Sequence, residues 1–396
     1  MPPLFGVTNF PRKYALLSVR GVTGITPQSI GESRCGLRKQ KQTSSQEELN
    51  KMKMNKWTMG LAAAGVVSLA SAAQAEENSV LTALSSTVIS GSAEVSYNGN
   101  LSGNNKFGDQ GFVANGASLA ISSPLGEGDY SAGFNVDLLL GNRADVFGSA
   151  GDGFLIKNAN IGLNVPFGNG IDLTVGLFDS IVGYETEASA SNPNVSRSYG
   201  YGLGPLTHTG ALASTSLTDG LNFSFGVANS FGSTLGNTAD DLADGNLTYM
   251  VGVEATVPDN LGFLAGSTVY VGYVDGAVSG RSNDDEDSHL YVGASVASPI
   301  EGVSLGVAYD DRTQHGAASD SDAVALYAVW DVSDGVSLAG RYDTIDRDGD
   351  SSSMWTATLG YSIWDNVLTR LEYNIESGHK ERGDSAGFAL NLYYQF

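Results

Sequence analysis

The sequence closes on FALNLYYQF, residues 388–396, in which large apolar side chains alternate with other residues. The large apolar side chains stand at every second position: Phe388, Leu390, Leu392, Tyr394 and Phe396. A period of two places them together on one face of a β-strand. Chain ends are usually polar and poorly ordered, so a strand that closes on such a face needs an apolar surrounding. A lipid bilayer would supply one.

The same period of two recurs throughout residues 86–396, whereas the 3.6-residue period of amphipathic helices is not evident. Most alternating segments contain 10–13 residues, close to the roughly 9–11 that a tilted transmembrane strand needs. Sixteen segments are predicted as strands: 86–98, 112–123, 128–141, 153–165, 170–178, 206–217, 220–229, 246–257, 263–275, 287–298, 301–311, 321–331, 334–346, 352–363, 365–376 and 385–396.

The connections between these segments are alternately short and long. Short ones include PLGE at 124–127, PFGN at 166–169 and PDNLG at 258–262. The long ones are rich in Gly, Ser, Asn and Asp: 99–111, 142–152, 179–205, 230–245, 276–286, 312–320, 347–351 and 377–384. A soluble sandwich has no reason to collect its long loops at one end, but an outer-membrane barrel has tight periplasmic turns and longer external loops. The predicted fold is therefore all-β, a transmembrane antiparallel β-barrel of about sixteen strands.

The last strand must pair with the first, because unpaired backbone groups are costly in hydrocarbon. Tyr394 and Phe396 are then expected at the inner membrane interface, where aromatic rings prefer to lie. The closing pattern also resembles the signal of outer-membrane barrels that the barrel assembly machinery reads, which implies an assembly role for these two residues. The alternative is a buried strand of a soluble protein.

Residues 52–75 are predicted to be a cleaved secretory signal peptide. A basic region around Lys53 and Lys56 precedes an apolar stretch, and Ala73-Gln74-Ala75 is a cleavage site of the A-x-A type. The alternative is a membrane anchor, but the apolar stretch of about 15 residues falls short of the roughly 20 that a span needs. We expect translation to start at Met52 or Met54, which would make 1–51 a mis-assigned upstream segment. Residues 76–85 are expected to be a periplasmic lead, and 86–396 the barrel, in the outer membrane of a Gram-negative bacterium.

Charge and cysteine content exclude several function classes. Residues 1–75 hold 10 of the 21 Lys and Arg residues but only 3 of the 43 Asp and Glu residues. The acidic remainder would repel nucleic acid, which is bound by basic patches. The single cysteine, Cys35, precedes the predicted barrel, so the barrel has no disulfide and no Cys-ligated metal.

Two stretches resemble the OmpL-like family of Gram-negative outer-membrane porins: ALSSTVISGSAEVSYN at 83–98 and NPNVSRSYGYGLGPLTHTGALAS at 192–214. The resemblance implies an outer-membrane pore and fixes no substrate. The predicted topology is also similar to that of general diffusion porins, in which the loop between strands five and six folds into the pore. That analogy implies a constriction at the longest loop, 179–205, and a possible homotrimer. The PEFGGD-type motif of enterobacterial porins is absent, so an ordinary surface loop is the alternative.

If lipid-facing and lumen-facing positions alternate, the polar positions line the channel. Glu185, Glu187 and Arg197 of the predicted constriction loop are expected to set its narrowest point. Seven strand acids and two strand bases are predicted to face the lumen: Glu94, Asp137, Asp172, Glu254, Asp310, Asp343 and Glu372, with Arg341 and Arg370. Any one of them can be a solvated wall residue. Their summed sign predicts a lumen that concentrates cations.

Metal-binding and catalytic patterns are weak. Asp346, Asp348 and Asp350 copy the first ligand spacing of a calcium loop, but Ala357 stands where a bidentate Glu is needed. Solvated surface charge is the simpler interpretation, and loose bridging by calcium or magnesium is the alternative. The histidines lack paired spacing and no nucleophile elbow is present, so no enzyme activity and no cofactor are expected. His208, between two threonines, is expected to fix the constriction loop.

These observations predict a passive diffusion channel for small hydrophilic solutes that prefers cations. The abundance of Ser, Gly, Asn and Thr at inward positions favours an open, wet lumen. Two alternatives stay open. One is a structural or adhesive barrel whose lumen is blocked, and the other is a substrate-specific channel.

Overall fold

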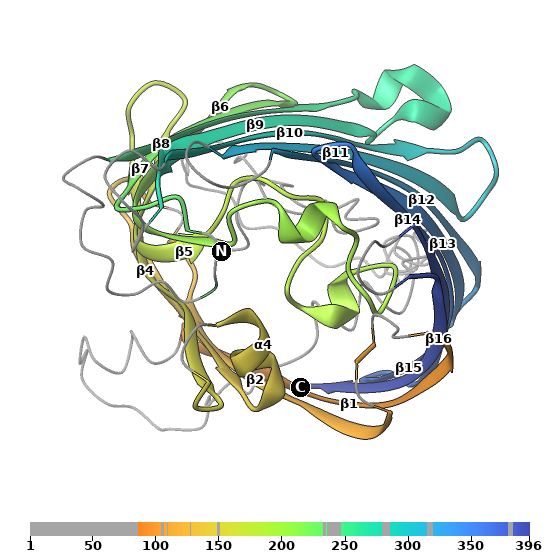
Figure 1. Ribbon diagram of the computed structural model, residues 1–396. Coiled ribbons are helices and arrows are strands. Elements are labelled where there is room, and N and C mark those ends of the chain that lie inside the picture. Colours follow the sequence, from red (N-terminus) through yellow and green to blue (C-terminus); the bar gives the residue numbers. More distant parts are fainter. Residues whose placement is uncertain are drawn as a thin grey trace, which may run out of the picture.

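The computed structural model describes residues 86–103, 107–108, 110–126, 128–148, 151–232, 235, 247–278, 286–314, 320–378 and 383–396. Within these ranges, sixteen antiparallel strands form a closed barrel in which each strand pairs with its sequence neighbours and β1 pairs with β16 (Figure 1). The predicted strands are confirmed, with ends that differ by at most five residues. The predicted segments 1–51, 52–75 and 76–85 lie outside the described residues.

The strands have these bounds: β1 Val88–Ser102, β2 Gly111–Ser123, β3 Ala132–Leu140, β4 Phe154–Val165, β5 Ile171–Asp179, β6 Thr207–Thr218, β7 Leu221–Ala228, β8 Thr248–Thr256, β9 Thr268–Ala277, β10 Glu286–Ala297, β11 Val303–Gln314, β12 Ser321–Ser333, β13 Val336–Arg347, β14 Asp350–Trp364, β15 Val367–Ser377 and β16 Ser385–Gln395. A six-residue helix, α4 (Asn142–Phe147), follows β3. The described residues also include three 3-10 helices: η1 (Ser189–Ser191), η2 (Gly200–Gly202) and η4 (Asp259–Leu264). None of the helices in the described part of the chain is long and apolar enough to cross a membrane.

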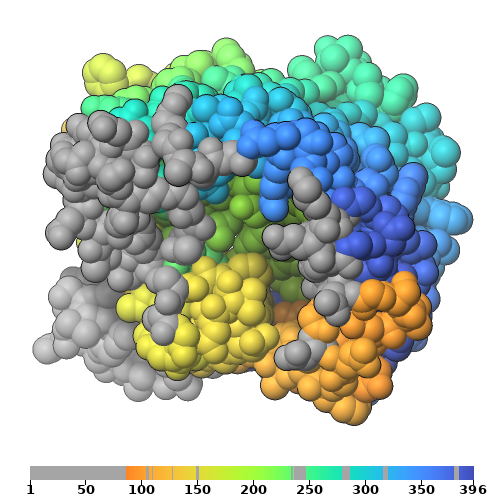
Figure 2. Space-filling model, in the orientation of Figure 1, coloured from red at the N-terminus to blue at the C-terminus, as the bar shows by residue number. Residues whose placement is uncertain are grey.

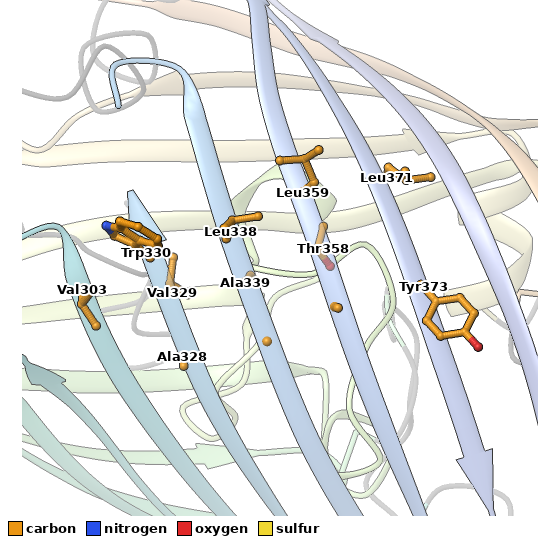
Figure 3. A pocket seen from close by; sticks show the side chains of 12 residues that line it. Val303, Ala328, Val329, Trp330, Leu338, Ala339, Thr358, Leu359, Leu371 and Tyr373 are labelled. Atoms are coloured by element: carbon orange, nitrogen blue, oxygen red, sulfur yellow. The ribbon is translucent and has the colours of Figure 1, made fainter. Parts of the chain in front are cut away.

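The outer wall of the barrel is apolar and its inner wall is buried. On β16, Leu390, Leu392 and Tyr394 are exposed, while the residues that alternate with them, such as Asn391 and Tyr393, are buried. This is the arrangement that the alternation in FALNLYYQF predicts. A shallow apolar groove of about 460 Å³ crosses the outer face of β12–β15 between Trp330, Leu359 and Tyr373, among other residues (Figure 3).

An arginine on this outer face is expected to destabilise the barrel. Leu371, which lines the groove on β15, is 48% exposed. Leu371→Arg should lower the free energy of unfolding by about 2–4 kcal/mol, because a cation at the bilayer midplane loses its hydration. Leu101→Arg, at the end of β1, should cost at most about 1 kcal/mol. Denaturant titrations in lipid vesicles measure both, and equal costs at the two positions would contradict the assignment of the lipid-facing wall.

The seam between β1 and β16 closes through a glycine. Gly91 donates its N–H to the carbonyl of Phe396 (3.1 Å) and accepts from the Phe396 N–H (3.0 Å). A Cβ atom at Gly91 would lie 2.6 Å from the carbonyl oxygen of Ser118 and 2.7 Å from the Phe396 ring. The missing side chain therefore lets the ring lie over the seam.

A side chain at this glycine should weaken closure. Gly91→Val is expected to cost about 1–3 kcal/mol, as overpacking does elsewhere, because the Ser118 carbonyl belongs to the backbone and cannot rotate away. Ala93→Val, on the exposed face of the same strand, should change stability by less than about 0.5 kcal/mol. The fraction that migrates as folded barrel on unheated gels measures both variants. If Gly91→Val shows the same folded fraction as wild type, the glycine is not needed for closure of the β1–β16 seam.

Two connections differ from the predicted pattern. Residues 347–351 are not a long loop, because Asp348 and Gly349 form a tight turn with φ values of 51° and 80°. Positive φ at both central residues suits the twist of a hairpin. The β8–β9 connection is longer than predicted and contains η4, which protrudes outside the ring of strands (Figure 1).

Candidate channel and its inward loops

The connection from β5 to β6 enters the barrel and crosses its interior (Figure 1). Its two ends lie together, since Ser180 donates its N–H to the carbonyl of Leu206 (2.9 Å). His208 fastens this neck, because its Nε2 lies 3.1 Å from the Ser180 hydroxyl and its Nδ1 lies 3.3 Å from the Ser230 carbonyl. In the space-filling view, atoms of this connection lie within the ring of strands (Figure 2).

Arg341 of β13 holds the loop against the opposite wall. Its buried guanidinium forms ion pairs with Glu185 of the loop (3.0 Å) and with Asp343 of its own strand (2.8 Å). It also donates to the carbonyl of Ser196 (2.7 Å). The N–H of Tyr199 donates to Asp343 (2.9 Å). Charge-assisted hydrogen bonds of this kind are the strong ones, so the loop is fixed at its middle.

Two residues of β15 hold the same loop between Ser189 and Ser196. Glu372 accepts from the backbone N–H of Ser196 (3.0 Å) and from the hydroxyl of Thr358 (2.8 Å). Arg370 donates to the carbonyls of Ser189 (2.9 Å) and Asn192 (3.3 Å). The two charged strand residues thus form hydrogen bonds with backbone groups of the loop. These groups need such partners because the loop has little regular secondary structure.

The three predicted constriction residues come together inside the barrel. Glu185 and Glu187 are only 4% and 5% exposed. The carboxylate of Glu185 accepts from the N–H (2.6 Å) and hydroxyl (2.7 Å) of Ser198. Arg197 donates to the carbonyls of Thr186 (2.7 Å) and Glu187 (2.6 Å). All three residues therefore stabilise the conformation of the loop in addition to carrying its charges.

The connection between β3 and β4 also enters the barrel, which the sequence patterns did not predict. It carries α4, whose Arg143 is buried and lies 3.1 Å from the Glu94 carboxylate of β1. The same guanidinium forms an ion pair with Glu187 and donates to its carbonyl (2.9 Å). Burial alone would lower the pKa of Arg143, but the neighbouring Glu187 and Glu94 carboxylates raise it above its ordinary value. Arg143 therefore stays charged between two acids.

One side of the lumen is filled by apolar side chains. Residues of β5 and the start of the loop, including Phe178, Ile181 and Val182, pack in one buried apolar cluster with inward residues of β8–β12. The rings of Tyr184 and Tyr327 stack at 4.3 Å. Burial raises the pKa of Tyr184 well above its ordinary value, so its hydroxyl stays neutral. The expectation of a lumen lined throughout by small polar residues is wrong for this side.

The side formed by β3–β5 is polar. Asp137 accepts from the side-chain amides of Asn135 (3.0 Å) and Asn158 (2.9 Å). Asp172 accepts from the amide of Asn164 (2.8 Å). This wall combines amides and carboxylates that water or a hydrophilic solute can solvate.

The nine strand charges predicted for the lumen all lie on inward faces. Glu254 is half-buried on β8, and Asp310 lies 3.2 Å from His289. Several further inward charges were missed: Lys157 pairs with Asp179 (2.9 Å), Arg312 pairs with Asp287, and Glu376 accepts from the Tyr199 hydroxyl (2.5 Å). The predicted count of seven acids against two bases therefore missed three acids and two bases among these residues.

The weak metal candidates do not converge. Asp346 accepts from the Gly349 N–H (2.8 Å) and the Ser351 hydroxyl (2.6 Å), so it serves the β13–β14 turn with Asp348 and Asp350 beside it. In the part of the chain that the structure describes, no group of three or more His, Cys, Asp or Glu side chains could hold a metal ion.

Solved outer-membrane channels share the fold at low sequence identity. OmpF of Salmonella typhi, in complex with daunomycin, is 15% identical with a TM-score of 0.59, covering 78% of this chain and 97% of its own. An anion-selective porin from Comamonas acidovorans is 14% identical with a TM-score of 0.55, covering 78% and 99%. The DcaP channel of Acinetobacter baumannii is 11% identical with a TM-score of 0.56, covering 78% and 97%.

No curated protein sequence matches the chain. A family profile described as "Putative beta-barrel porin-2, OmpL-like" matches residues 86–394, which span the whole closed barrel. The predicted resemblance is confirmed, and the chain belongs to the OmpL-like family of outer-membrane β-barrel porins.

Proposed function

We propose that this porin is a passive diffusion channel for small hydrophilic solutes. The observation that carries the proposal is a closed barrel with an apolar outer wall and charged inner positions, crossed by a fixed loop. Sixteen-stranded barrels are wide enough to enclose an aqueous channel. Nothing in the proposal requires an energy source, a cofactor or enzyme chemistry.

The permeation path runs along the polar wall of β3–β5. The apolar cluster around Ile181 and Tyr184 begins at Phe178 near the end of β5 and continues to β12. It closes that side of the interior, because water gains no partners there. Loop 179–205 would narrow the path, with Glu185, Glu187 and Arg197 at its edge. The buried ion pairs of this loop support a fixed constriction in place of a swinging gate.

The proposed preference is for cations. Arginines neutralise Glu94, Glu185 and Glu187, whereas Asp137 and Asp172 accept hydrogen bonds from amides that leave their charge in place. A negative wall in a confined channel concentrates cations, and salt weakens the effect over a Debye length of about 10 Å at 0.1 M. The fold alone does not fix the sign, since an anion-selective porin shares it.

A second candidate is a structural or adhesive barrel with a blocked lumen. The apolar cluster favours it, because fifteen buried residues from β5–β12 and the connections between them fill part of the interior. Its expected behaviour is the opposite of a porin's: a stable outer-membrane protein that passes no solute.

Export, assembly and oligomerisation complete the proposal. A signal peptide at 52–75 would lead the chain to the periplasm, and the barrel assembly machinery would read Tyr394 and Phe396 before insertion into outer-membrane lipid. A homotrimer is proposed by analogy with OmpT of Vibrio cholerae, which shares the fold and has been solved in a trimer form.

Liposome swelling separates the two candidates. The protein, purified folded from outer membranes, is placed in vesicles that are then diluted into neutral sugars of increasing size. We expect rapid swelling with small sugars and slower swelling as solute size rises. Swelling no faster than that of empty vesicles, from protein that migrates as a folded barrel, would support the blocked barrel and overturn the channel.

A further inference from the structure

The two inward segments of the barrel meet at one side chain. Arg143 of α4 contacts β1 through Glu94 and the long loop through Glu187. We infer that Arg143 is a specificity-determining residue of the channel, which sets how strongly the lumen discriminates between cations and anions. This inference rests on the proposed channel function.

The charges around Arg143 are closely balanced. Its guanidinium faces two carboxylates, all three groups are at least nine-tenths buried, and Arg370 also acts electrostatically on Glu94. Asn391 of β16 donates to the second oxygen of Glu94 (2.7 Å), and the Glu187 carbonyl accepts from both Arg143 and Arg197. Loss of Arg143 would remove one positive charge from this balance at the junction of the loop with the wall, where the protein screens charges less than bulk water does.

The backbone that carries Arg143 is held by contacts that do not involve its charge. Leu139, Ala144 and Leu155 form a buried apolar cluster with Leu235. Leu235 donates its N–H to the carbonyl of Phe147 (2.9 Å), and the Phe147 ring meets the Tyr201 ring edge-on at 5.9 Å. A substitution that removes only the charge should therefore leave α4 in place and change the electrostatics of the lumen.

The position is also suited to influence permeating ions. Lys157 and Asp179 form an ion pair on the neighbouring polar wall, and both Asp137 and Glu187 act electrostatically on Lys157. The Arg143 cluster and the polar wall thus belong to one charged region. Only a few residues determine the net charge of this region, so the loss of one cation changes that net charge by a large fraction.

The test is the reversal potential of single channels in a potassium chloride gradient. Arg143→Gln should raise the ratio of cation to anion permeability by about twofold or more. Arg143→Lys should stay close to wild type, and Arg143→Gln combined with Glu187→Gln should return toward it. Arg347→Gln, which removes the same charge at the exposed end of β13, is the matched control and should have little effect.

Each outcome decides the inference. An unchanged ratio in Arg143→Gln would overturn it, as would an equal shift in Arg347→Gln. If Arg143→Gln fails to fold, Glu94→Gln with Glu187→Gln keeps the cation and removes both acids, and must shift the ratio toward anions. If the folded wild-type protein does not conduct at all, the proposed channel function itself is wrong. That failure is distinct from an unchanged permeability ratio, which would overturn only the role of Arg143.

Discussion

A chain in which residues 181–205 are replaced by a short Gly-Ser linker is expected to conduct severalfold more current per channel than wild type. The expectation follows from the neck of the loop, where Ser180 and Leu206 are joined by a 2.9 Å hydrogen bond. A few residues can bridge these ends without moving β5 or β6. Removal of the loop leaves a sixteen-stranded barrel whose interior still holds α4 but is wider along the polar wall.

Single-channel conductance in 1 M KCl, where charge effects are largely screened, measures the width of the path. The matched control replaces residues 259–264, which form η4 outside the ring of strands (Figure 1). That variant should keep wild-type conductance. A loop-free barrel that folds and conducts like wild type would mean that residues 181–205 do not restrict the channel.

Loss of Arg341 should have the largest effect of any single lumen substitution on stability. Arg341→Ala leaves Glu185 and Asp343 as buried carboxylates without their shared cation. Breaking a buried pair in this way typically costs about 3–5 kcal/mol. The loop also loses the donor to the Ser196 carbonyl, so its middle should detach and single-channel current should become noisy.

Denaturant titration and current noise measure the two consequences separately. Arg347→Ala, on the same strand but exposed, should change the free energy of unfolding by less than about 0.5 kcal/mol. Asp343→Asn with Glu185→Gln in the Arg341→Ala background should recover part of the loss, because neutral side chains cost less to bury. Wild-type stability and quiet current in Arg341→Ala would show that the clamp contributes little.

The barrel was predictable because one physical rule governs all its strands. A residue on a membrane strand faces either lipid or the interior, so the alternation in stretches such as FALNLYYQF shows which positions face lipid. The same rule put all nine predicted lumen charges on inward faces. The rule did not predict the inward position of Lys157, because the β3–β4 pairing shifts register between Asp137 and Leu138. A bulge of this kind breaks the alternation of inward and outward residues.

The interior was harder to predict because its contacts are not local. Arg143 and Glu94 are 49 residues apart, and α4 is too short for a helical period to show. The β9 stretch VYVGYV does indicate the apolar side of the interior, since both its faces are apolar. Apolar residues on both faces are typical of strands buried on both sides. The Asp348-Gly349 pair, a common hairpin signal, could likewise have identified the β13–β14 turn.

The most direct test of the account is the single-channel current of the wild-type protein under a potassium chloride gradient. A channel whose polar wall carries Asp137 and Asp172 should open in discrete steps and reverse at a potential of cation sign. Reversal at a potential of anion sign, or no steps from protein shown to be folded, would contradict the account.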